Sequence, residues 1–158
     1  MDGFVVRPTR VGEGVFAART HASGDRLMLV RGERLHRSQL PPIGVPEDDR
    51  FVQVGREEYL GPSGDLDDLV NHSCDPNAGL AFCDDGIWVV AIRDIPAGAE
   101  VAWDYSTTMD EDDWEIDCAC GASACRGRIR DFKHLPDETQ ARYVALGIVP
   151  EYVRASSP

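Results

Sequence analysis

Short apolar runs separated by turn-forming residues make up most of the first hundred positions. Runs of this kind, bounded by Gly, Pro, Asp or Ser, are typical of β-strands. An Asp-Gly pair between two apolar segments favours a tight hairpin turn, and Asp85-Gly86 stands between such segments. The pattern predicts strands, with a strand pair in each of the longer stretches, at residues 3–6, 14–18, 26–30, 51–60, 80–92 and 100–105.

One helix is predicted, near the C-terminal end. Residues 136–147, PDETQARYVALG, begin with a proline and acids and end at a glycine, which are the usual start and stop signals of a helix. Asp65 is expected to cap a single turn that runs to Leu69. The proline-rich stretch 40–50 is expected to be a loop, and the acidic run 109–117 is expected to stay solvated. The overall prediction is a mainly β domain with a short C-terminal helix.

The composition is that of a folded, acidic domain. The 158 residues suffice for one globular domain, and 42% of them are apolar. Lys and Arg number 16 against 28 Asp and Glu, and the formal charge of −12 would repel a phosphate backbone and attract a cationic partner. The sequence shows neither a secretory signal nor a stretch long enough to span a bilayer. We therefore expect a cytoplasmic monomer that binds neither nucleic acid nor a membrane.

The five cysteines, an odd number, favour metal binding over disulfides in a reducing compartment. Cys118, Cys120 and Cys125 have the spacing C-x-C-x4-C and can supply three thiolates, whereas structural zinc sites use four ligands. Cys83 lies in an apolar strand and is expected to be a buried free thiol. Cys74, in a polar turn, is the favoured fourth ligand. The remaining candidates are the histidines: His21, His36, His72 and His134.

Four motifs follow one another along the chain. They are GEGVFA at 12–17, NHSCDPN at 71–77, IRDIPAGAEVAWDY at 92–105 and CACGASACRG at 118–127. In this order they resemble the SET-domain protein lysine methyltransferases with a post-SET zinc loop, over roughly residues 4–130. The Ala-, Gly-, Asp- and Arg-rich composition indicates a short, single-domain, bacterial type. The resemblance implies a SET domain at 1–115, a post-SET zinc loop at 116–130 and a helical tail at 131–158.

The resemblance also implies a fold, an activity and a set of site residues. The fold is a group of small β-sheets whose C-terminal pseudoknot would place Tyr105 beside Asn71 and His72. The activity is methyl transfer from S-adenosylmethionine to a lysine amine of a basic protein or peptide, with Tyr105 aligning the reacting groups and one structural zinc ion present. The cofactor would lie against Gly12, Glu13, Gly14, Val15, Asn71, His72 and Tyr105, and zinc on Cys74, Cys118, Cys120 and Cys125.

The chain departs from the family pattern in several places. Asp68 stands where relatives often have an arginine, and the segment 31–50, which would cradle the substrate peptide, is short. The second active-site tyrosine of many relatives falls at Phe51 or Tyr59, and both are expected in the substrate channel. Trp103, also in the channel, stands where relatives have Phe or Tyr. Its larger ring predicts mainly monomethyl-lysine, although an indole lacks the hydroxyl by which a Tyr holds a blocking water.

Two other functions stay open on the sequence alone. The main alternative is a non-catalytic SET-like module that keeps the zinc and binds a basic peptide, since Asp68 and the unplaced second tyrosine weaken the match to active relatives. Tyr105, Asn71 and His72 favour the enzyme. A zinc-bearing nucleic-acid binder is disfavoured further by the charge of −12.

Overall fold

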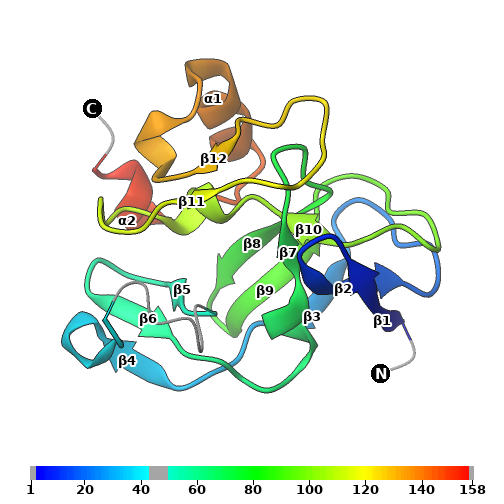
Figure 1. Ribbon diagram of the computed structural model, residues 1–158, viewed down its shortest axis with the longest axis horizontal. Helices are drawn as coiled ribbons and strands as arrows, with labels where there is room; N and C mark the ends of the chain where they lie inside the picture. Colours follow the sequence, from blue (N-terminus) through cyan, green and yellow to red (C-terminus); the bar gives the residue numbers. More distant parts are fainter. Residues whose placement is uncertain (1–2, 43–49, 157–158) are drawn as a thin grey trace.

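The computed structural model describes residues 3–42 and 50–156, in which small β-sheets carry short helical turns and a helical tail (Figure 1). The largest sheet has three antiparallel strands in the order β3-β9-β8. Its strands are β3 (Arg26–Leu29), β8 (Ala78–Cys83) and β9 (Gly86–Ala91). The hairpin predicted at 80–92 is confirmed. Its turn lies one residue earlier than predicted, at Asp84-Asp85, because Gly86 already pairs with Cys83.

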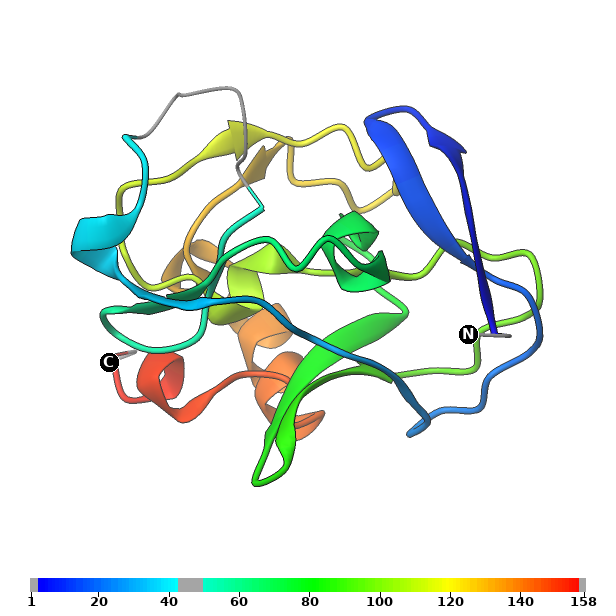
Figure 2. The ribbon, with the colours of Figure 1, turned by 90° about the horizontal axis from the view of Figure 1, so that it is seen from below.

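A separate hairpin forms the N-terminal edge of the molecule. Strands β1 (Phe4–Thr9) and β2 (Gly12–Ala17) pair antiparallel from Phe4 with Ala17 to Thr9 with Gly12. Both strands were predicted, and each extends further toward the turn than the apolar run alone. In Figures 1 and 2 this hairpin lies at the opposite end of the molecule from the C-terminal helices.

A second three-stranded sheet has the order β4-β6-β5. The pair predicted within 51–60 is confirmed as β5 (Val52–Gln53) and β6 (Glu58–Leu60). Strand β4 (Arg34–His36) and the 3-10 turn η1 (Arg37–Gln39) were not predicted. Their stretch, RLHRSQ, has no apolar alternation, and β6 on its other side supplies the pairing. Positions 43–49 of the predicted loop 40–50 lie outside the described residues.

Two very short parallel strands bring distant motifs together. β7 (Asn71–His72) pairs with β10 (Ala102–Trp103), with Ala102 opposite Asn71 and Trp103 opposite His72. This confirms the expectation that the segment carrying Tyr105 lies beside the NHSC motif. The strand predicted at 100–105 is shorter than expected, because the 3-10 turn η3 (Tyr105–Thr108) begins right after Asp104.

The acidic run is not simply solvated, contrary to prediction. Glu111 is half-buried, and Asp113 and Asp112 form ion pairs with Arg37 and Lys133. The run leads into β11 (Ile116–Asp117), which pairs with β12 (Arg128–Ile129) across the cysteine loop. Figure 2 shows this stretch running along one side of the molecule from the region of η1 toward the β1–β2 hairpin.

The turn predicted from Asp65 to Leu69 is confirmed as η2 (Leu66–Leu69), but its expected cap is wrong. The Asp65 side chain makes no capping hydrogen bond. The carboxylate of Asp68 instead accepts hydrogen bonds from the Ser63 and Gly64 backbone amides, at 3.0 and 2.7 Å. Asp68, at the family's arginine position, therefore closes the loop before the NHSC motif.

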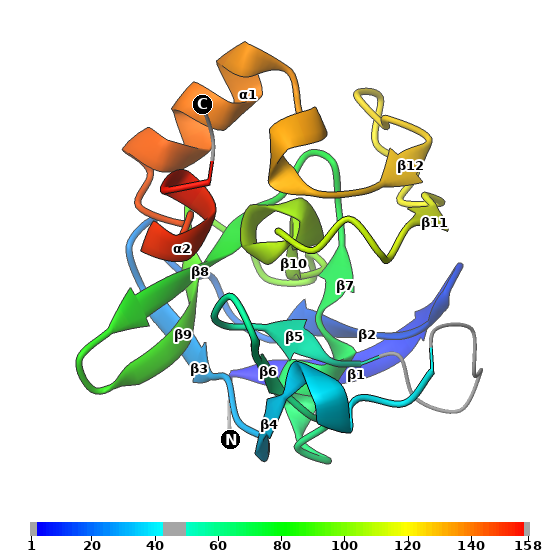
Figure 3. The ribbon, with the colours of Figure 1, turned by 90° about the vertical axis from the view of Figure 1, so that its left-hand side faces the viewer.

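The C-terminal tail packs onto the β-sheets. The predicted helix is confirmed as α1 (Asp137–Ala145), preceded by the turn η4 (Phe132–His134) and followed by the short α2 (Glu151–Arg154). A Cβ built on Gly79 of β8 would lie 2.5 Å from Ile148, so only glycine permits the tail to approach this strand so closely. Figures 1 and 3 show the tail and the β11–β12 hairpin on the same side of β8 and β9.

The hydrophobic core is divided between the sheets and the tail. The larger cluster joins β2, β6, β8, β9 and β10, and the tail cluster is centred on Phe132, Tyr143 and Ile148. No helix in the described ranges is long and apolar enough to cross a membrane.

Candidate functional site

One cavity of about 620 Å³ collects most of the residues that the motifs indicate. Its volume is within the usual range for small-molecule sites, about 300–1,000 Å³. Six predicted site residues do not line it: Gly12 at the β1–β2 turn, Gly14 in β2, Val15, which is fully buried in the core, and the predicted metal ligands Cys74, Cys118 and Cys125. The predicted residues on its walls are Glu13, Phe51, Tyr59, Asn71, His72, Trp103, Tyr105 and Cys120.

Tyr105 is held at the centre of these residues by contacts at both ends. Its hydroxyl donates to the Val70 carbonyl at 2.9 Å, and its backbone amide donates to Nδ1 of His72 at 3.2 Å. Its ring centroid is 4.8 Å from that of Trp103, which is buried. The phenolic oxygen and the Val70 carbonyl therefore form a polar point beside the Trp103 and Tyr105 rings.

His72 is a neutral linker in this arrangement. Burial lowers the pKa of His72 to about 4, and the nearby Asp104 carboxylate offsets only part of that effect. Because Nδ1 accepts the Tyr105 amide, the ring proton belongs on Nε2, which then donates to the Cys74 sulfur at 3.3 Å. His72 thus connects the Tyr105 backbone with the cysteine cluster.

Asn71 explains the need for glycine in the first motif. Its side-chain amide donates to the Glu13 carbonyl and to the Glu100 carboxylate, both at 2.9 Å. A Cβ on Gly14 would lie 2.7 Å from that amide and 2.6 Å from Glu100, so Gly14 admits the close packing of β2 on Asn71. The backbone carbonyl of Val15, a predicted cofactor contact, accepts a hydrogen bond from Val101.

The cysteines gather next to this cavity. Ligand atoms of His72, Cys74, Cys118 and Cys120 all lie within 4.8 Å of one another, and the Cys125 thiol donates to the Cys118 backbone carbonyl at 3.8 Å. Three thiols and an imidazole so close together have the donor chemistry of a structural zinc site. Of the predicted ligands, Cys74, Cys118 and Cys120 belong to this group, whose fourth member is His72 and not Cys125.

The thiols of this group differ in how readily they ionise. Burial raises the pKa of Cys74 to about 11 and also raises that of Cys118. At Cys120 the effect of burial is outweighed by hydrogen bonds from backbone amides, which lower the pKa to about 7. Several neighbouring thiolates are stable only with a positive ion between them. Cys83 lies apart, free and only partly buried, so the expectation that it is a buried thiol was partly wrong.

Two important residues were missed in the sequence. Asp104, between Trp103 and Tyr105, is fully buried, and its Oδ1 accepts a 2.9 Å hydrogen bond from the Arg126 guanidinium. Burial works against the charge on Arg126, but the Asp104 carboxylate outweighs it and raises the pKa of the guanidinium. The available signal was a carboxylate inside an apolar strand, AWDY, which requires a buried donor.

The two candidates for the second tyrosine both line the cavity. Tyr59 is buried, and its hydroxyl donates to the Glu111 carboxylate. Burial and that hydrogen bond raise the pKa of Tyr59, and burial raises the pKa of Glu111. Phe51 is half-buried. Tyr59 is therefore the one of the two that offers a hydroxyl to this cavity.

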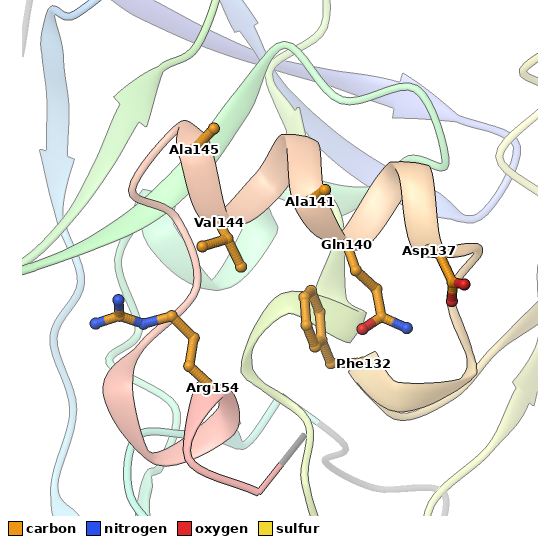
Figure 4. A pocket seen from close by; sticks show the side chains of 7 residues that line it. All are labelled: Phe132, Asp137, Gln140, Ala141, Val144, Ala145 and Arg154. Atoms are coloured by element: carbon orange, nitrogen blue, oxygen red, sulfur yellow. The ribbon is translucent and has the colours of Figure 1, made fainter. Parts of the chain in front are cut away.

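A second hollow, of about 710 Å³, lies on the C-terminal tail (Figure 4). It is formed by α1, α2 and η4, and Phe132, Val144 and Arg154 are among the side chains that line it. None of the motif residues lies on its walls, so the chemistry of the chain is concentrated in the first cavity.

Comparison with known proteins agrees with this site. The SET-domain family matches residues 12–106. "Histone-lysine N-methyltransferase TRX1" of Oryza sativa is 31% identical over 137 residues, and "Histone-lysine N-methyltransferase, H3 lysine-4 specific" of Saccharomyces cerevisiae is 28% identical over 131. These alignments cover 76% and 72% of the present chain, which spans only 13% and 12% of those proteins.

A solved structure with a similar fold is that of KRYPTONITE in complex with mCHG DNA and SAH. It has a TM-score of 0.65 at 18% identity, and the match covers 80% of this chain and 28% of that one. The family match spans more than half of the chain and contains the GEG, NHSC and WDY motifs that surround the cavity. The chain belongs to the SET-domain family.

Proposed function

We propose that this protein is a protein lysine N-methyltransferase that uses S-adenosylmethionine. One observation carries the proposal: the Tyr105 hydroxyl lies 2.9 Å from the Val70 carbonyl, inside a cavity that also presents Asn71 and His72. The names of the relatives, histone-lysine N-methyltransferases, support the same activity. The size of the cavity supports it as well, since about 620 Å³ suits a small-molecule cofactor.

The residues of the chain suit an in-line methyl transfer. S-adenosylmethionine, when bound, supplies a methyl group on a sulfonium, and the substrate amine forms the new N–C bond as the S–C bond breaks. Lysine has a solution pKa of about 10.4, and burial of the amine away from water beside the Trp103 and Tyr105 rings would favour its neutral, nucleophilic form because desolvation penalises charge. The Tyr105 hydroxyl and the Val70 carbonyl would orient the amine and the methyl group, the carbonyl through weak C–H···O contacts. The proton released from the product amine leaves to solvent.

The zinc site and the domain limits belong to the same proposal. Cys74, Cys118, Cys120 and Cys125 would hold one zinc ion, which would tie the post-SET loop at 116–130 to the SET domain at 1–115. The contact of Cys74 with Cys118, and the grouping of both with Cys120, support three of these four ligands. The ion is structural, because four thiolates leave no open position for a reactant.

A lysine in a basic protein segment is the proposed substrate. Six acids and three arginines line the cavity walls, and the chain has a formal charge of −12. Such a field raises the local concentration of cationic peptides. Histone-like peptides are suitable probes, since "H3 lysine-4 specific" is part of the name of one relative.

The test exploits an unusual feature of the sequence, its single lysine, Lys133. The variant Lys133→Arg removes every lysine from the enzyme and can keep the ion pair with Asp112. The lysine-free variant is incubated with labelled S-adenosylmethionine and either a basic lysine peptide or a lysate of the source cells. The label should then be found on substrate lysines only, and mass spectrometry locates it. Adding Tyr105→Phe to the same chain is the matched control.

The alternative, a zinc-bearing module that binds a basic peptide without reaction, makes the opposite prediction. It would bind the peptide with the same affinity whether or not S-adenosylmethionine is present, and no label would transfer. The occupied hydrogen-bond positions around Tyr105 favour the enzyme, because a pure binding module has no need for a hydroxyl held against a carbonyl.

A further inference from the structure

The carboxylate of Asp104 is fully buried directly before Tyr105. Its Oδ1 accepts hydrogen bonds from the Arg126 guanidinium at 2.9 Å and from the Ser106 backbone amide at 3.2 Å. Its Oδ2 accepts the hydroxyl of Tyr143 at 3.0 Å. Three separated segments, η3, the cysteine loop and helix α1, therefore meet on one side chain.

Tyr143 comes from the C-terminal tail, beyond the residues 12–106 that match the SET-domain family. It is 0% exposed, and it packs with Phe132 and Ile148 in the tail cluster. The close contact of Ile148 with Gly79 holds the tail against β8. The Tyr143 hydroxyl is thus delivered to Asp104 from a rigid, packed element and not from a mobile end.

The orientation of Asp104 controls the start of η3. Asp104 is the N-cap of that turn, so its Oδ1 bond to the Ser106 amide sets where the turn begins. Tyr105 is the first residue of the turn, and its hydroxyl must lie against the Val70 carbonyl. A rotation of the Asp104 carboxylate would disturb the turn and move the Tyr105 ring.

Among the hydrogen bonds of the described residues, Tyr143 is the one partner of Oδ2. A buried carboxylate oxygen without a donor is costly, so loss of the hydroxyl would favour rotation toward other donors or entry of water. Arg126 alone cannot prevent this, because it contacts only Oδ1.

We infer that Tyr143 is a positioning residue for methyl transfer, and that it acts through the Asp104 carboxylate on the placement of Tyr105. Helix α1 then belongs to the catalytic unit, although it lies outside the family match. This inference rests on the proposed function, but its structural half can be measured without any reaction.

The test compares Tyr143→Phe with Tyr152→Phe. Tyr152 is the matched control, because it lies in the same tail and its half-buried hydroxyl donates to the carbonyls of Gln53 and of Thr108, at the far end of η3, instead of to Asp104 at its start. Each variant loses one hydroxyl and keeps its ring. The measurements are kcat, KM for a basic lysine peptide, the Kd for S-adenosylhomocysteine, and hydrogen exchange of the Ser106 amide by NMR.

With Tyr143→Phe we expect kcat to fall about ten-fold, with KM and Kd within about two-fold, as for a group whose placement matters in the transition state. The Ser106 amide should exchange faster, on the order of ten-fold, since its acceptor is no longer fixed. Tyr152→Phe should leave kcat and the Ser106 amide within about two-fold of the unchanged protein.

Two results would overturn the inference. One is an unchanged kcat and Ser106 exchange rate in Tyr143→Phe; the other is an equal loss in both variants, which would indicate general loosening of the tail. If the unchanged protein transfers no methyl group to any substrate, the proposed function fails, and the Ser106 amide alone decides the positioning role. If Tyr143→Phe does not fold, a fluorotyrosine at position 143 keeps the shape and alters only the donor, and the Ser106 amide must still respond.

Discussion

Two adjoining stretches of the chain contribute to the same cavity in opposite ways. Residues 103–109 are almost entirely buried, and their polar groups are satisfied by hydrogen bonds inside the protein. Residues 110–117 are half-buried or exposed, and their carboxylates pair with basic side chains at the surface, as in Arg37–Asp113 and Arg128–Glu115. The first stretch carries the proposed chemistry, and the second forms a wall on the side open to solvent.

The comparison teaches where the rigidity of the site is placed. A buried charge pair with full hydrogen bonding fixes geometry but is costly to disturb, whereas exposed ion pairs contribute about 0–1 kcal/mol and exchange partners easily. A group that must be aligned to within a fraction of an ångström suits the first environment. A surface that receives cationic peptides suits the second, because its acids can leave their arginine partners for a substrate.

The zinc ion should be the strongest link between the two stretches, since Cys74 follows β7, which pairs with Trp103 of the buried stretch, and Cys118 follows the acidic one. Cys74→Ser should lose the metal, which is expected at one ion per chain, whereas Cys83→Ser should keep it. Structural zinc is worth about 10–16 kcal/mol of apparent binding free energy in small peptides. Metal analysis of both purified variants checks this, and equal zinc loss in the two would contradict the ligand set.

Two further measurements identify the fourth zinc ligand and test the role of the post-SET loop. Cys125→Ser should lose zinc, and His72→Gln should retain it. Mild chelation of the unchanged protein should weaken binding of S-adenosylhomocysteine more than it unfolds the β-sheets, because the loop lies beside the cavity and the core lies behind it. Calorimetry measures the binding and circular dichroism measures the unfolding on one sample. Global unfolding after chelation would contradict the expectation that zinc orders mainly the loop.

The buried ion pair should show the next largest effect. Arg126→Met leaves the Asp104 carboxylate without its cation, and breaking a buried pair typically costs about 3–5 kcal/mol of unfolding free energy. Urea unfolding with zinc present measures the loss. The double variant Arg126→Met with Asp104→Asn should recover part of it, since no unpaired charge remains. A loss of unfolding free energy below about 1 kcal/mol would mean that this pair contributes no more than an exposed ion pair.

Tyr105→Phe removes a single hydroxyl from the buried stretch. It should cut turnover by a factor on the order of 10² or more while the Kd for S-adenosylmethionine changes only a few-fold, because alignment and not binding is lost. A methylation assay and calorimetry on one preparation test both parts. If turnover survives, Tyr105 is structural, and the hydroxyl of Tyr59 becomes the candidate for alignment.

Trp103 tests how closely the buried wall fits its substrate. Its ring is buried 4.8 Å from the Tyr105 ring, so a further methyl group on the amine should meet resistance of about 1–3 kcal/mol. The unchanged enzyme should therefore form mainly monomethyl-lysine, and Trp103→Phe should shift the product toward di- and trimethyl-lysine. Mass spectrometry of the peptide gives the answer, and trimethyl product from the unchanged enzyme would remove the steric argument.

The smallest effect is expected in the acidic stretch. Arg37→Ala breaks the exposed pair with Asp113 and should lower the unfolding free energy by less than about 1 kcal/mol. The difference should shrink further in about 1 M salt, where the Debye length is about 3 Å. Thermal unfolding at two salt concentrations measures this. A loss as large as that of Arg126→Met would erase the contrast between the two stretches.

The sequence by itself determined the elements and the motif chemistry. Apolar runs bounded by turn residues are local signals, so the β8–β9 hairpin, the β5–β6 pair and helix α1 were predicted close to their observed limits. The spacing of Cys118, Cys120 and Cys125 likewise required a fourth ligand from elsewhere, and Cys74 was the favoured choice. Elements without local signals, such as β4, were missed because their pairing partner lies far along the chain.

Only the tertiary structure decided which polar groups meet. Asp104, Arg126 and Tyr143 come from three segments, and nothing within any one segment shows that the other two approach it. The same holds for Gly14, whose missing side chain makes room for Asn71, and for the acidic run, whose partners Arg37 and Lys133 come from distant segments. Local sequence sets backbone preference and burial, whereas the partner of a buried charge depends on packing across the whole chain, which local patterns do not encode.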